Sequence, residues 1–308
     1  MHIKFEEAAI FLSKKFKNVT HLQHLAEGWW AQAFSFRCEK GKFVMRISAH
    51  PQDFLKDKFA YKNFNSTTVP IARILETGQF NQQFHYCLSV FCEGLTADKL
   101  LAKLDHETAS AIVPSILQPL YHIHQLDTSQ LTGWGFTDHH GNGGWRSWPE
   151  YLSSMFNQKY RVSWQDLGRT SWLDPVLFSR LHNRMQELFQ YLPKEKSILH
   201  GDYGYDNLLL NTDHQPTAVL DWGEMLLGDE LYDLIHMNEP WDTENTTISY
   251  LSSWKEEIEA QQIEIVHFDQ RLECYLIHYA LFHLHIHTAR LEEKDYHHIA
   301  RWAERELL

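Results

Sequence analysis

The fold of this chain is decided by the stretch Ser197-Ile-Leu-His-Gly-Asp-Tyr-Gly-Tyr-Asp-Asn-Leu-Leu-Leu210 and by Val219-Leu-Asp-Trp-Gly223, which follows it. Two apolar runs enclose a polar loop that contains Asp202 and Asn207, and Asp221 comes fourteen residues after Asn207. Phosphoryl transfer from ATP requires a carboxylate beside the acceptor hydroxyl and oxygen ligands that hold magnesium on the phosphates. The stretch supplies all three groups, so it predicts a site for this chemistry.

Each of these three residues also has a purely structural interpretation, because Asp and Asn are common in turns and at helix caps. A single such residue would favour that interpretation. The spacing of Asp202, Asn207 and Asp221, however, matches the kinase order of catalytic Asp, metal-binding Asn and metal-binding Asp. We therefore interpret the three together as catalytic machinery.

The part of the chain before this stretch predicts a small sheet with one inserted helix. Alternating apolar residues indicate strands, and apolar residues three and four apart indicate helices. The expected elements are helices at residues 5–16 and 53–64 and strands at 33–37, 42–47, 71–75 and 84–90. Around residues 91–96 the pattern changes to short polar sequence with a glycine. We place the domain boundary there, between domains 1–91 and 92–308.

The second domain reads as mostly helical. Helices are expected at residues 97–126 and 175–192 and throughout the chain after 231, whereas residues 131–148 read as a loop rich in Gly and Trp. A sheet followed by helices in separate regions predicts an α+β protein.

Composition places the chain among ordinary globular proteins. Its 308 residues are 44% hydrophobic, 14% aromatic and 22% charged, which excludes a disordered, collagen-like or coiled-coil chain. No segment approaches the roughly 18 apolar residues of a membrane span, and the start lacks a signal-peptide pattern. The four cysteines form no C-x-x-C pair. We therefore expect a cytoplasmic protein with reduced cysteines.

The charge of the chain is unevenly distributed. The net charge of −12 disfavours binding to nucleic acid or to an anionic membrane. Residues 1–95 carry 12 basic and 8 acidic side chains, whereas residues 96–308 carry 16 and 32. Ten acidic residues and no Lys or Arg fall between residues 202 and 242, which indicates a cationic partner. They are Asp202, Asp206, Asp213, Asp221, Glu224, Asp229, Glu230, Asp233, Glu239 and Asp242.

With these motifs the chain resembles the aminoglycoside phosphotransferase family, whose signature is H-G-D-x-x-x-x-N followed by D-W. The resemblance continues through Gly228-Asp-Glu-Leu-Tyr-Asp-Leu234, which is similar to the family's G-D-x-x-Y-D-L segment. It implies a protein-kinase-like fold with a small antiparallel-sheet N-lobe and a larger, mostly helical C-lobe. Segments most similar to hygromycin B phosphotransferases are Phe34-Ser-Phe36, Val44-Met-Arg46, Val69-Pro70, Gly133-Trp-Gly135 and Glu239-Pro-Trp241.

The resemblance implies a role for each residue of the signature. Asp202 would orient or deprotonate the acceptor hydroxyl, and Asn207 and Asp221 would bind Mg²⁺. His200 would brace the loop. Asp229 and Asp233 lie four residues apart at the start of an expected helix, which favours a capping or loop-bracing role over a substrate contact.

The resemblance also implies an ATP site in the first domain. Arg46 would pair with the α- and β-phosphates, where protein kinases use Lys. Asp57 occupies the place of its acidic partner, where Glu is common. Gly28 lies where the phosphate-covering loop belongs, although this segment fails as a G-x-G-x-x-G motif. Backbone groups of Ser89 and Phe91 would read adenine, but the apolar run there is equally compatible with a core strand.

For the acceptor, we expect Glu224 and Glu239 to face the cleft with Trp241 beside them, the alternative being a solvated acidic face. The leading function is phosphorylation of a cationic aminoglycoside by a monomeric enzyme that confers antibiotic resistance. Two alternatives stay open: a metabolite kinase for choline, homoserine, a thiosugar or a glycated amine, and a catalytically silent binding module. The choice between ATP and GTP is also open.

The 21 histidines raise the question of a metal site near the end of the chain. His283 and His287 have the i, i+4 spacing of a helical metal-binding pair, and His285 lies between them. No Glu or Cys completes the set in the local sequence. We therefore favour helix packing or surface exposure for these histidines.

Overall fold

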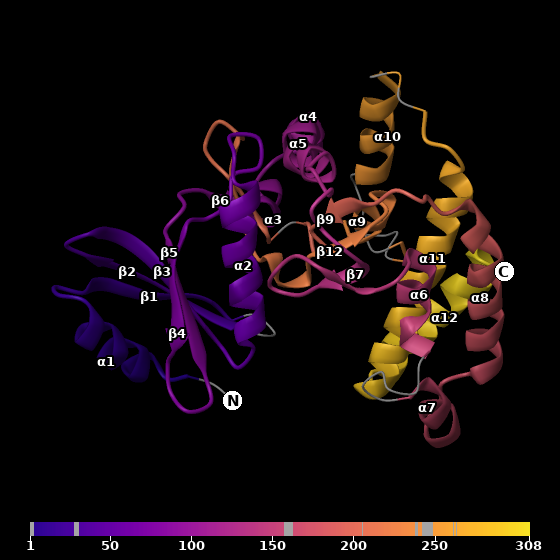
Figure 1. Cartoon of the computed structure of the whole chain (residues 1–308), viewed down its shortest axis with the longest axis horizontal. Helices are drawn as coiled ribbons and strands as arrows, with labels where there is room; N and C mark the ends of the chain where they lie inside the picture. The colour runs from indigo at the N-terminus through magenta and orange to yellow at the C-terminus, as the bar shows by residue number, and fades with distance from the viewer. Residues whose placement is uncertain are drawn as a thin grey trace.

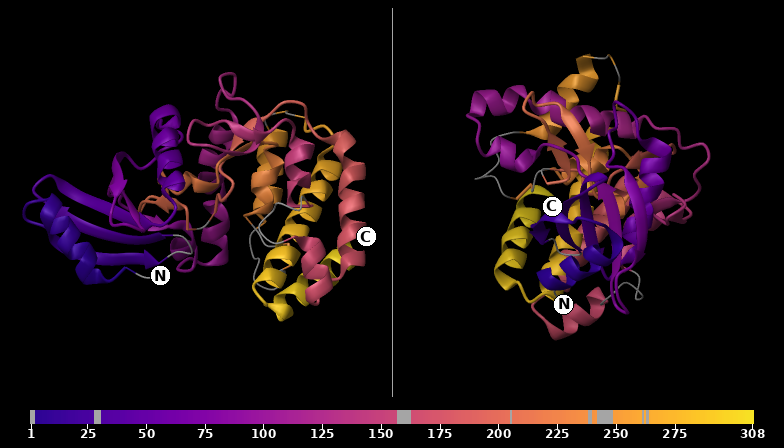
Figure 2. Two further views of the ribbon diagram at one scale, coloured as in Figure 1. Left: turned by 60° about the horizontal axis from the view of Figure 1, so that its bottom comes forward. Right: turned by 90° about the vertical axis from the view of Figure 1, so that its left-hand side faces the viewer.

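The computed structural model describes residues 3–27, 31–156, 163–204, 206–237, 240–241, 249–260, 262 and 264–308. Figure 1 shows two lobes, a sheet with two helices that contains the N-terminus and a larger, mostly helical lobe that contains the C-terminus. The sheet and the C-terminal helices also lie at opposite ends in the left view of Figure 2. The predicted α+β fold class is therefore confirmed.

The N-terminal lobe is built on a five-stranded antiparallel sheet in the order β1-β2-β3-β5-β4. Phe34 and Phe36 alternate along β2, and Leu12 of α1 is buried in the same apolar cluster. Burial of such side chains drives the sheet and helix together. The elements are α1 (Phe5–Lys15), β1 (Thr20–Glu27), β2 (Ala31–Cys38), β3 (Gly41–Ser48), α2 (Pro51–Phe64), β4 (Ile74–Gln79) and β5 (His85–Val90).

Helix α2 lies between the sheet and the larger lobe (Figure 1). It begins at Pro51, where the missing N–H leaves no helical hydrogen bond unmade. Its buried residues include Phe54, Asp57 and Phe64. Asp57 is the charged member of this buried set, so it requires a charged or hydrogen-bonding partner.

The C-terminal lobe combines helices with short strands. The helices are α3 (Ala97–Leu101), α4 (His106–Ala111), α5 (Val113–His124), α6 (Trp148–Ser153), α7 (Trp164–Thr170), α8 (Pro175–Leu188), α9 (Leu231–Ile235), α10 (Tyr250–Ala260), α11 (Phe268–Ala289) and α12 (Glu293–Glu306). The strands are β6 (Leu95–Thr96), β7 (Trp134–Thr137), β8 (Gly143–Trp145), β9 (Ser197–Leu199), β10 (Leu208–Leu210), β11 (Pro216–Val219) and β12 (Leu226–Gly228). Short 3₁₀ helices lie at Ser154–Phe156, Phe189–Tyr191 and Trp222–Glu224.

The single helix expected at residues 97–126 is wrong, because the structure divides this region into α3, α4 and α5. Asp105 caps α4 by accepting a hydrogen bond from the Thr108 amide at 2.8 Å. Pro114 lies in the first turn of α5, where proline is tolerated, whereas inside a longer helix it would remove a hydrogen bond. The cap and the proline thus mark helix starts within a continuous apolar pattern.

Three strand expectations also need correction. Strand β1 was not expected, because most of its side chains are exposed on the sheet edge and the sequence lacks apolar alternation. Strand β4 begins at Ile74 rather than at residue 71. The loop expected at residues 131–148 contains the strands β7 and β8. Strands β1, β4 and β8 lie at sheet edges, where pairing with one neighbour matters more than a buried face, which explains their weak sequence signal.

Two small sheets position the decisive stretch. One has the order β11-β10-β6 and the other β8-β7-β12-β9. The polar loop therefore leaves the second sheet at β9 and enters the first at β10. The amide of Val219 at the end of β11 donates to the carbonyl of Pro70 at 2.7 Å, which ties this region to the N-terminal lobe.

Two further expectations concern membranes and cysteines. None of the helices in the described part of the chain combines the length and the apolar character needed to cross a membrane. The four cysteines are free thiols, and Cys87 and Cys274 are fully buried.

Candidate active site

The loop after β9 is shaped by a glycine that no other residue replaces easily. Gly201 has a φ of +82°, and a Cβ there would lie 2.2 Å from the carbonyl oxygen of Glu224. This close approach lets the chain turn sharply so that Asp202 follows at the surface of the lobe. The local sequence His200-Gly201-Asp202 thus sets the direction of the Asp202 side chain.

Asp233 supports this turn from within the lobe. Its carboxylate accepts hydrogen bonds from the backbone amides of His200 and Gly201, both at 2.8 Å. It also contacts Nε2 of His124 at 3.0 Å. Burial alone would raise the pKa of Asp233, but the hydrogen bond and charge of His124 hold the pKa below its ordinary value. A buried carboxylate thus fixes the loop backbone.

His200 and Asp229 are buried as well. The imidazole Nε2 of His200 lies 2.9 Å from the carbonyl oxygen of Leu220, the residue before Asp221. The carboxylate of Asp229 forms a two-point ion pair with Arg271 of α11. These contacts connect the two halves of the decisive stretch to each other and to the helical core.

Asp202 and Asn207 lie in direct contact. The amide nitrogen of Asn207 donates to the Asp202 carboxylate at 2.9 Å and to the Asp202 carbonyl at 2.8 Å. Partial desolvation at the edge of the lobe, followed by the nearby charges of Asp206 and Asp221, raises the pKa of Asp202 to about 7. A carboxylate with a pKa near neutrality suits a general base at physiological pH.

The donor chemistry at Asn207 and Asp221 fits a magnesium ion. Both hydrogen bonds of Asn207 described above use its amide nitrogen, which leaves the amide oxygen as a ligand atom. The Asp221 side chain is 51% exposed, and its backbone adopts a left-handed conformation with φ 58°. Carboxylate and amide oxygens are the hard ligands that Mg²⁺ prefers. These two residues would therefore hold the ion and the phosphates it bridges.

Arg46 on β3 lies opposite this ligand pair. Its guanidinium forms an ion pair with Asp57 of α2 and reaches the Asp221 carboxylate at 3.6 Å. Asp57 also accepts a hydrogen bond from the amide of Trp222 at 2.9 Å. One buried carboxylate thus links the sheet, α2 and the segment that follows Asp221.

The two residues expected to contact adenine lie close together: Ser89 is near the end of β5, and Phe91 directly follows this strand. Ser89 is paired within the sheet, with Val44 on one side and Ile74 on the other. The amide of Phe91 donates to the carbonyl of Lys42 at 3.1 Å, so an adenine contact at Phe91 would use its carbonyl group. Gly28, expected over the phosphates, lies outside the described residues.

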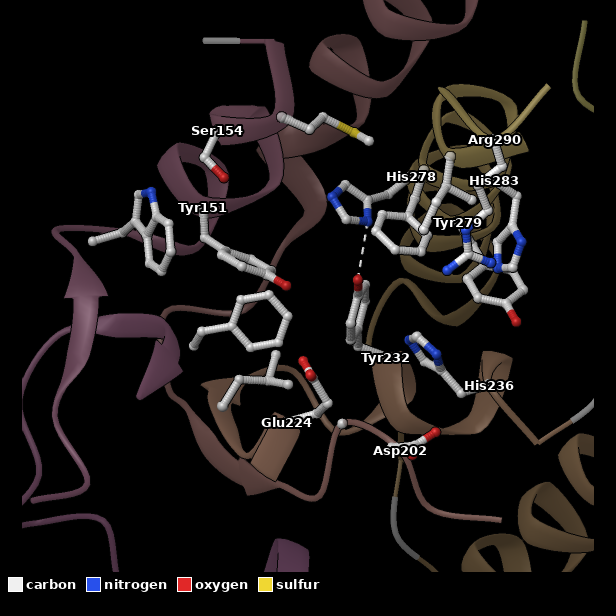
Figure 3. Close-up of a pocket in the computed structure, with 17 residues that line it drawn as sticks. Tyr151, Ser154, Asp202, Glu224, Tyr232, His236, His278, Tyr279, His283 and Arg290 are labelled. Carbon is white, nitrogen blue, oxygen red and sulfur yellow. Dashed lines mark hydrogen bonds between the residues drawn. The ribbon is translucent and has the colours of Figure 1, made fainter. Parts of the chain in front are cut away.

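A pocket of about 360 Å³ opens beside Asp202 (Figure 3). Asp202 and Glu224 lie along its lower edge in this view, and His283 and Arg290 lie at the upper right. Aromatic rings dominate its wall. The lining residues are Phe136, Trp145, Tyr151, Ser154, Met155, Gly201, Asp202, Glu224, Leu226, Tyr232, His236, His278, Tyr279, Phe282, His283, Ile286 and Arg290.

The histidines of the pocket are neutral at physiological pH. Burial lowers the pKa of His236 to about 4 and that of His278 to about 3. Burial, together with the neighbouring His287, also lowers the pKa of His283 to about 3. Nδ1 of His278 lies 3.0 Å from the hydroxyl of Tyr232. These imidazoles can therefore hydrogen-bond to hydroxyl groups without adding positive charge.

The three residues expected to bind the acceptor have different positions. Glu224 lines the pocket. Trp241 lies behind the wall, where its ring stacks on the lining residue Tyr279 at a centroid distance of 5.2 Å. Glu239 lies outside the described residues.

Sequence reasoning missed most of the pocket wall. Tyr232 and His236 come from α9, whereas His278 and Tyr279 come from α11. The only local signal was the four-residue spacing of Tyr232 and His236, which places both on one face of a helix. Lys56 was also missed: its ammonium group donates to the carbonyl of Gly223 at 2.5 Å and so connects α2 to the Asp221 segment.

Comparisons with known proteins identify the family of this chain. Residues 21–263 match the model of a family described as the phosphotransferase enzyme family. The chain is also similar to hygromycin-B 4-O-kinase of Escherichia coli, with 28% identity over 236 residues. That match covers 75% of this chain and 66% of the relative, slightly less than two thirds of its length.

Solved structures show the same architecture. The crystal structure of aminoglycoside phosphotransferase APH(4)-Ia superimposes with a TM-score of 0.83 at 22% identity and covers 98% of each chain. A thermostable mutant of that enzyme, in a ternary complex with ADP and hygromycin B, gives a TM-score of 0.81 at 22% identity with 96% of each chain covered. The likeness shows that this chain has the protein-kinase-like fold of aminoglycoside kinases.

Proposed function

Because the chain belongs to the phosphotransferase enzyme family, we propose that it transfers the γ-phosphate of ATP to a hydroxyl of a cationic aminoglycoside such as hygromycin B. The observation that carries this proposal is the position of Asp202, which contacts Asn207 and also lines the pocket. The names of a curated relative and of a solved complex support hygromycin B as the acceptor. The enzyme would act as a cytoplasmic monomer and confer resistance.

The nucleotide would lie between the lobes, with its phosphates between Arg46 and the pair Asn207 and Asp221. Bound Mg²⁺ would neutralise charge on the phosphates and hold them for in-line transfer. Arg46 already lies 3.6 Å from Asp221, so the guanidinium and the metal-binding carboxylate face the same space. Asp57 keeps the guanidinium in place through their ion pair.

The acceptor would occupy the pocket of Figure 3 with its reactive hydroxyl at Asp202. The Asp202 carboxylate would accept the hydroxyl proton as the oxygen attacks the γ-phosphorus and the bond to the leaving ADP oxygen breaks. Glu224 would bind an ammonium group next to that hydroxyl. The aromatic wall would pack against the apolar faces of the sugar rings.

The activity of the enzyme should decrease as the pH is lowered below neutrality. Asp202 must be unprotonated to accept a proton, and its pKa of about 7 means that kcat/KM for the acceptor rises as the pH increases through this value. Bound magnesium would move this limb to lower pH. The Asp206 charge is the second cause of the raised pKa, so Asp206→Asn should also move the limb to lower pH. A pH profile unchanged in Asp206→Asn would contradict the assignment of the limb to Asp202.

Removing the charge of Glu224 should weaken acceptor binding. Hydrogen bonds to charged groups contribute about 1.5–3 kcal/mol, so Glu224→Gln should raise the acceptor KM about tenfold or more and leave the KM for ATP nearly unchanged. The wild-type acceptor KM should also rise with salt, since exposed charges are screened over about 8 Å. Steady-state kinetics at several salt concentrations provides the measurement.

Asp213 offers a matched control for Glu224. It belongs to the same acidic stretch, but it is exposed in the β10–β11 turn and does not line the pocket. Asp213→Asn should therefore leave both KM values unchanged. Equal effects of the two substitutions would mean that the acidic stretch acts only through its overall charge.

The proposed function is tested by ADP release from the purified protein with a panel of acceptors. We expect turnover with hygromycin B and a product whose mass increases by one phosphate. Expression in a susceptible bacterium should raise tolerance to the same compound. Efficient phosphorylation of a neutral or anionic metabolite, without modification of any aminoglycoside, would overturn the proposal in favour of a metabolite kinase.

A further inference from the structure

The turn between α11 and α12 brings together a histidine and two carboxylates that the nucleotide and acceptor sites do not use. His287 lies in the last turn of α11, Glu292 immediately precedes α12, and Asp295 lies in the first turn of α12. One ligand atom from each of the three residues lies within 4.8 Å of the other two. The sequence spacing of His283 and His287 had raised the question of a metal site. The carboxylates that complete the set, however, lie at the start of the next helix.

The backbone of the turn places Glu292 over the end of α11. The amide of Glu292 donates to the carbonyl of His287 at 2.9 Å. This path requires Leu291 to adopt a φ of 64°, although leucine is disfavoured in the left-handed region and its side chain is 79% exposed. The Glu292 carboxylate then lies 2.6 Å from Nδ1 of His287.

The second ring nitrogen of His287 lies next to another histidine. This Nε2 atom lies 3.5 Å from Nδ1 of His283, one turn earlier on α11. A metal-binding histidine typically donates its second ring N–H to an acceptor, which fixes its tautomer and orientation. Nδ1 of His283 lies within reach of Nε2 of His287 and can serve as that acceptor. In the metal-free protein the 2.6 Å contact is a hydrogen bond from the Nδ1–H of His287 to the Glu292 carboxylate, so a bound ion would replace this proton between Nδ1 and the carboxylates.

The N-terminal position of the carboxylates on α12 explains only part of this arrangement. Acidic side chains at a helix start are stabilised by the helix dipole, which accounts for Glu293 and Asp295. It does not account for the contact of Glu292 with an imidazole nitrogen across the turn. Around a tetrahedral ion, ligands about 2.0 Å from the metal lie roughly 3.3 Å apart, so only small side-chain movements would close the set.

We propose that His287, Glu292 and Asp295 form a binding site for a divalent transition-metal ion of the Zn²⁺ class, with water as the remaining ligand. The imidazole distinguishes this set from the all-oxygen magnesium ligands of the nucleotide site, because nitrogen ligands favour zinc over Mg²⁺. Two carboxylates balance the charge of the ion. Zinc binding at this site does not require the proposed phosphotransferase activity.

The site lies next to the acceptor pocket through one shared residue. His283 lines the pocket, where Figure 3 shows it beside Tyr279 and Arg290. A bound ion would fix His287 and, through it, the orientation of the His283 ring. The metal would thus stabilise both the α11–α12 connection and one end of the pocket wall.

Equilibrium dialysis of the chelator-treated full-length protein against Zn²⁺, in buffer without Mg²⁺, tests the proposal. We expect about one equivalent of tightly bound zinc. His287→Ala, Glu292→Gln and Asp295→Asn should each weaken this binding at least tenfold, since even indirect ligand supports change affinity 10- to 100-fold. Replacing zinc with Co²⁺ should give the visible absorption of a tetrahedral cobalt site in the wild type and not in these three variants. Circular dichroism verifies that each variant is folded.

His297 provides the matched control. It lies on α12, 48% exposed and 3.6 Å from Glu293, so it is a surface histidine with a carboxylate neighbour but without the third ligand. His297→Ala should retain the tight equivalent of zinc. The proposal is overturned if no stoichiometric zinc binds, if the folded Glu292→Gln variant binds zinc as tightly as the wild type, or if His287→Ala and His297→Ala lose binding equally.

Discussion

Replacing Asp202 with alanine is expected to abolish phosphate transfer while MgATP binding stays within a few-fold of wild type. The Asp202 carboxylate lines the pocket and would accept the hydroxyl proton. The phosphates would instead contact Arg46 directly, and Asn207 and Asp221 would hold the metal ion on them. Removing a positioned general base typically costs about 10²–10⁴ in rate, and more when the same group also orients the acceptor. Single-turnover kinetics and calorimetric titration with MgATP measure the two effects separately.

The exposed neighbour Asp206 gives the control for this experiment. It lies on the same loop and contributes charge, but it does not line the pocket. Asp206→Asn should therefore retain turnover at neutral pH. Turnover near the wild-type rate in Asp202→Ala would remove the catalytic assignment, whereas loss of MgATP binding in that variant would move Asp202 into the nucleotide site.

The largest effect on stability is expected for Asp229→Ala. The Asp229 side chain is fully buried and accepts hydrogen bonds from Arg271 at 2.8 Å and 2.5 Å. The hydroxyl of Tyr275 also donates to it. Removing the carboxylate leaves a buried guanidinium without its charge partner, which typically costs about 3–5 kcal/mol of unfolding free energy. Urea unfolding of the full-length protein gives this quantity.

A second ion pair on α11 provides the comparison. Arg184 of α8 and Glu273 of α11 are 40% and 30% exposed, so their attraction is screened by water. Glu273→Gln should therefore change the unfolding free energy by no more than about 1 kcal/mol. A similar loss of stability in Asp229→Ala and Glu273→Gln would contradict the role of Asp229 as a buried support of the helical lobe.

The convergence of the three candidate groups could be predicted from sequence because it depends on short-range geometry. Gly201 forces a sharp turn next to Asp202, and five residues later the chain returns with Asn207. The hairpin of β10 and β11 then brings Asp221 back to the same edge. Each step spans few residues, so the spacing of the residue types is sufficient to predict that the three groups converge.

The contact of Arg46 with Asp57 was expected only because of the family resemblance, which places the acidic partner of Arg46 on the inserted helix. The structure brings them into an ion pair. The hydrogen bond from the amide of Trp222 to Asp57 could not be predicted from sequence, because it depends on how the two lobes meet rather than on either segment alone.

The pocket beside Asp202 and the proposed zinc site lay beyond sequence reasoning. Pocket residues come from β7, α6, α9 and α11, and each reads locally as an ordinary core or surface residue. The left-handed turn at Leu291 sets the approach of Glu292 to His287, although the absence of a local glutamate argued against a metal. A left-handed conformation at one residue leaves no periodic pattern in the sequence from which it could be predicted.

The sequence by itself determined the α+β class, the phosphotransferase motif and the identity of the three catalytic candidates. These properties follow from local chain geometry and from the chemistry of neighbouring side chains. The tertiary structure alone decided the helix breaks before Pro114, the position of Trp241 behind the pocket wall and the neutral histidines beside Asp202. The pKa of a side chain and the shape of a pocket depend on burial by segments distant in sequence, which becomes defined only when the lobes pack together.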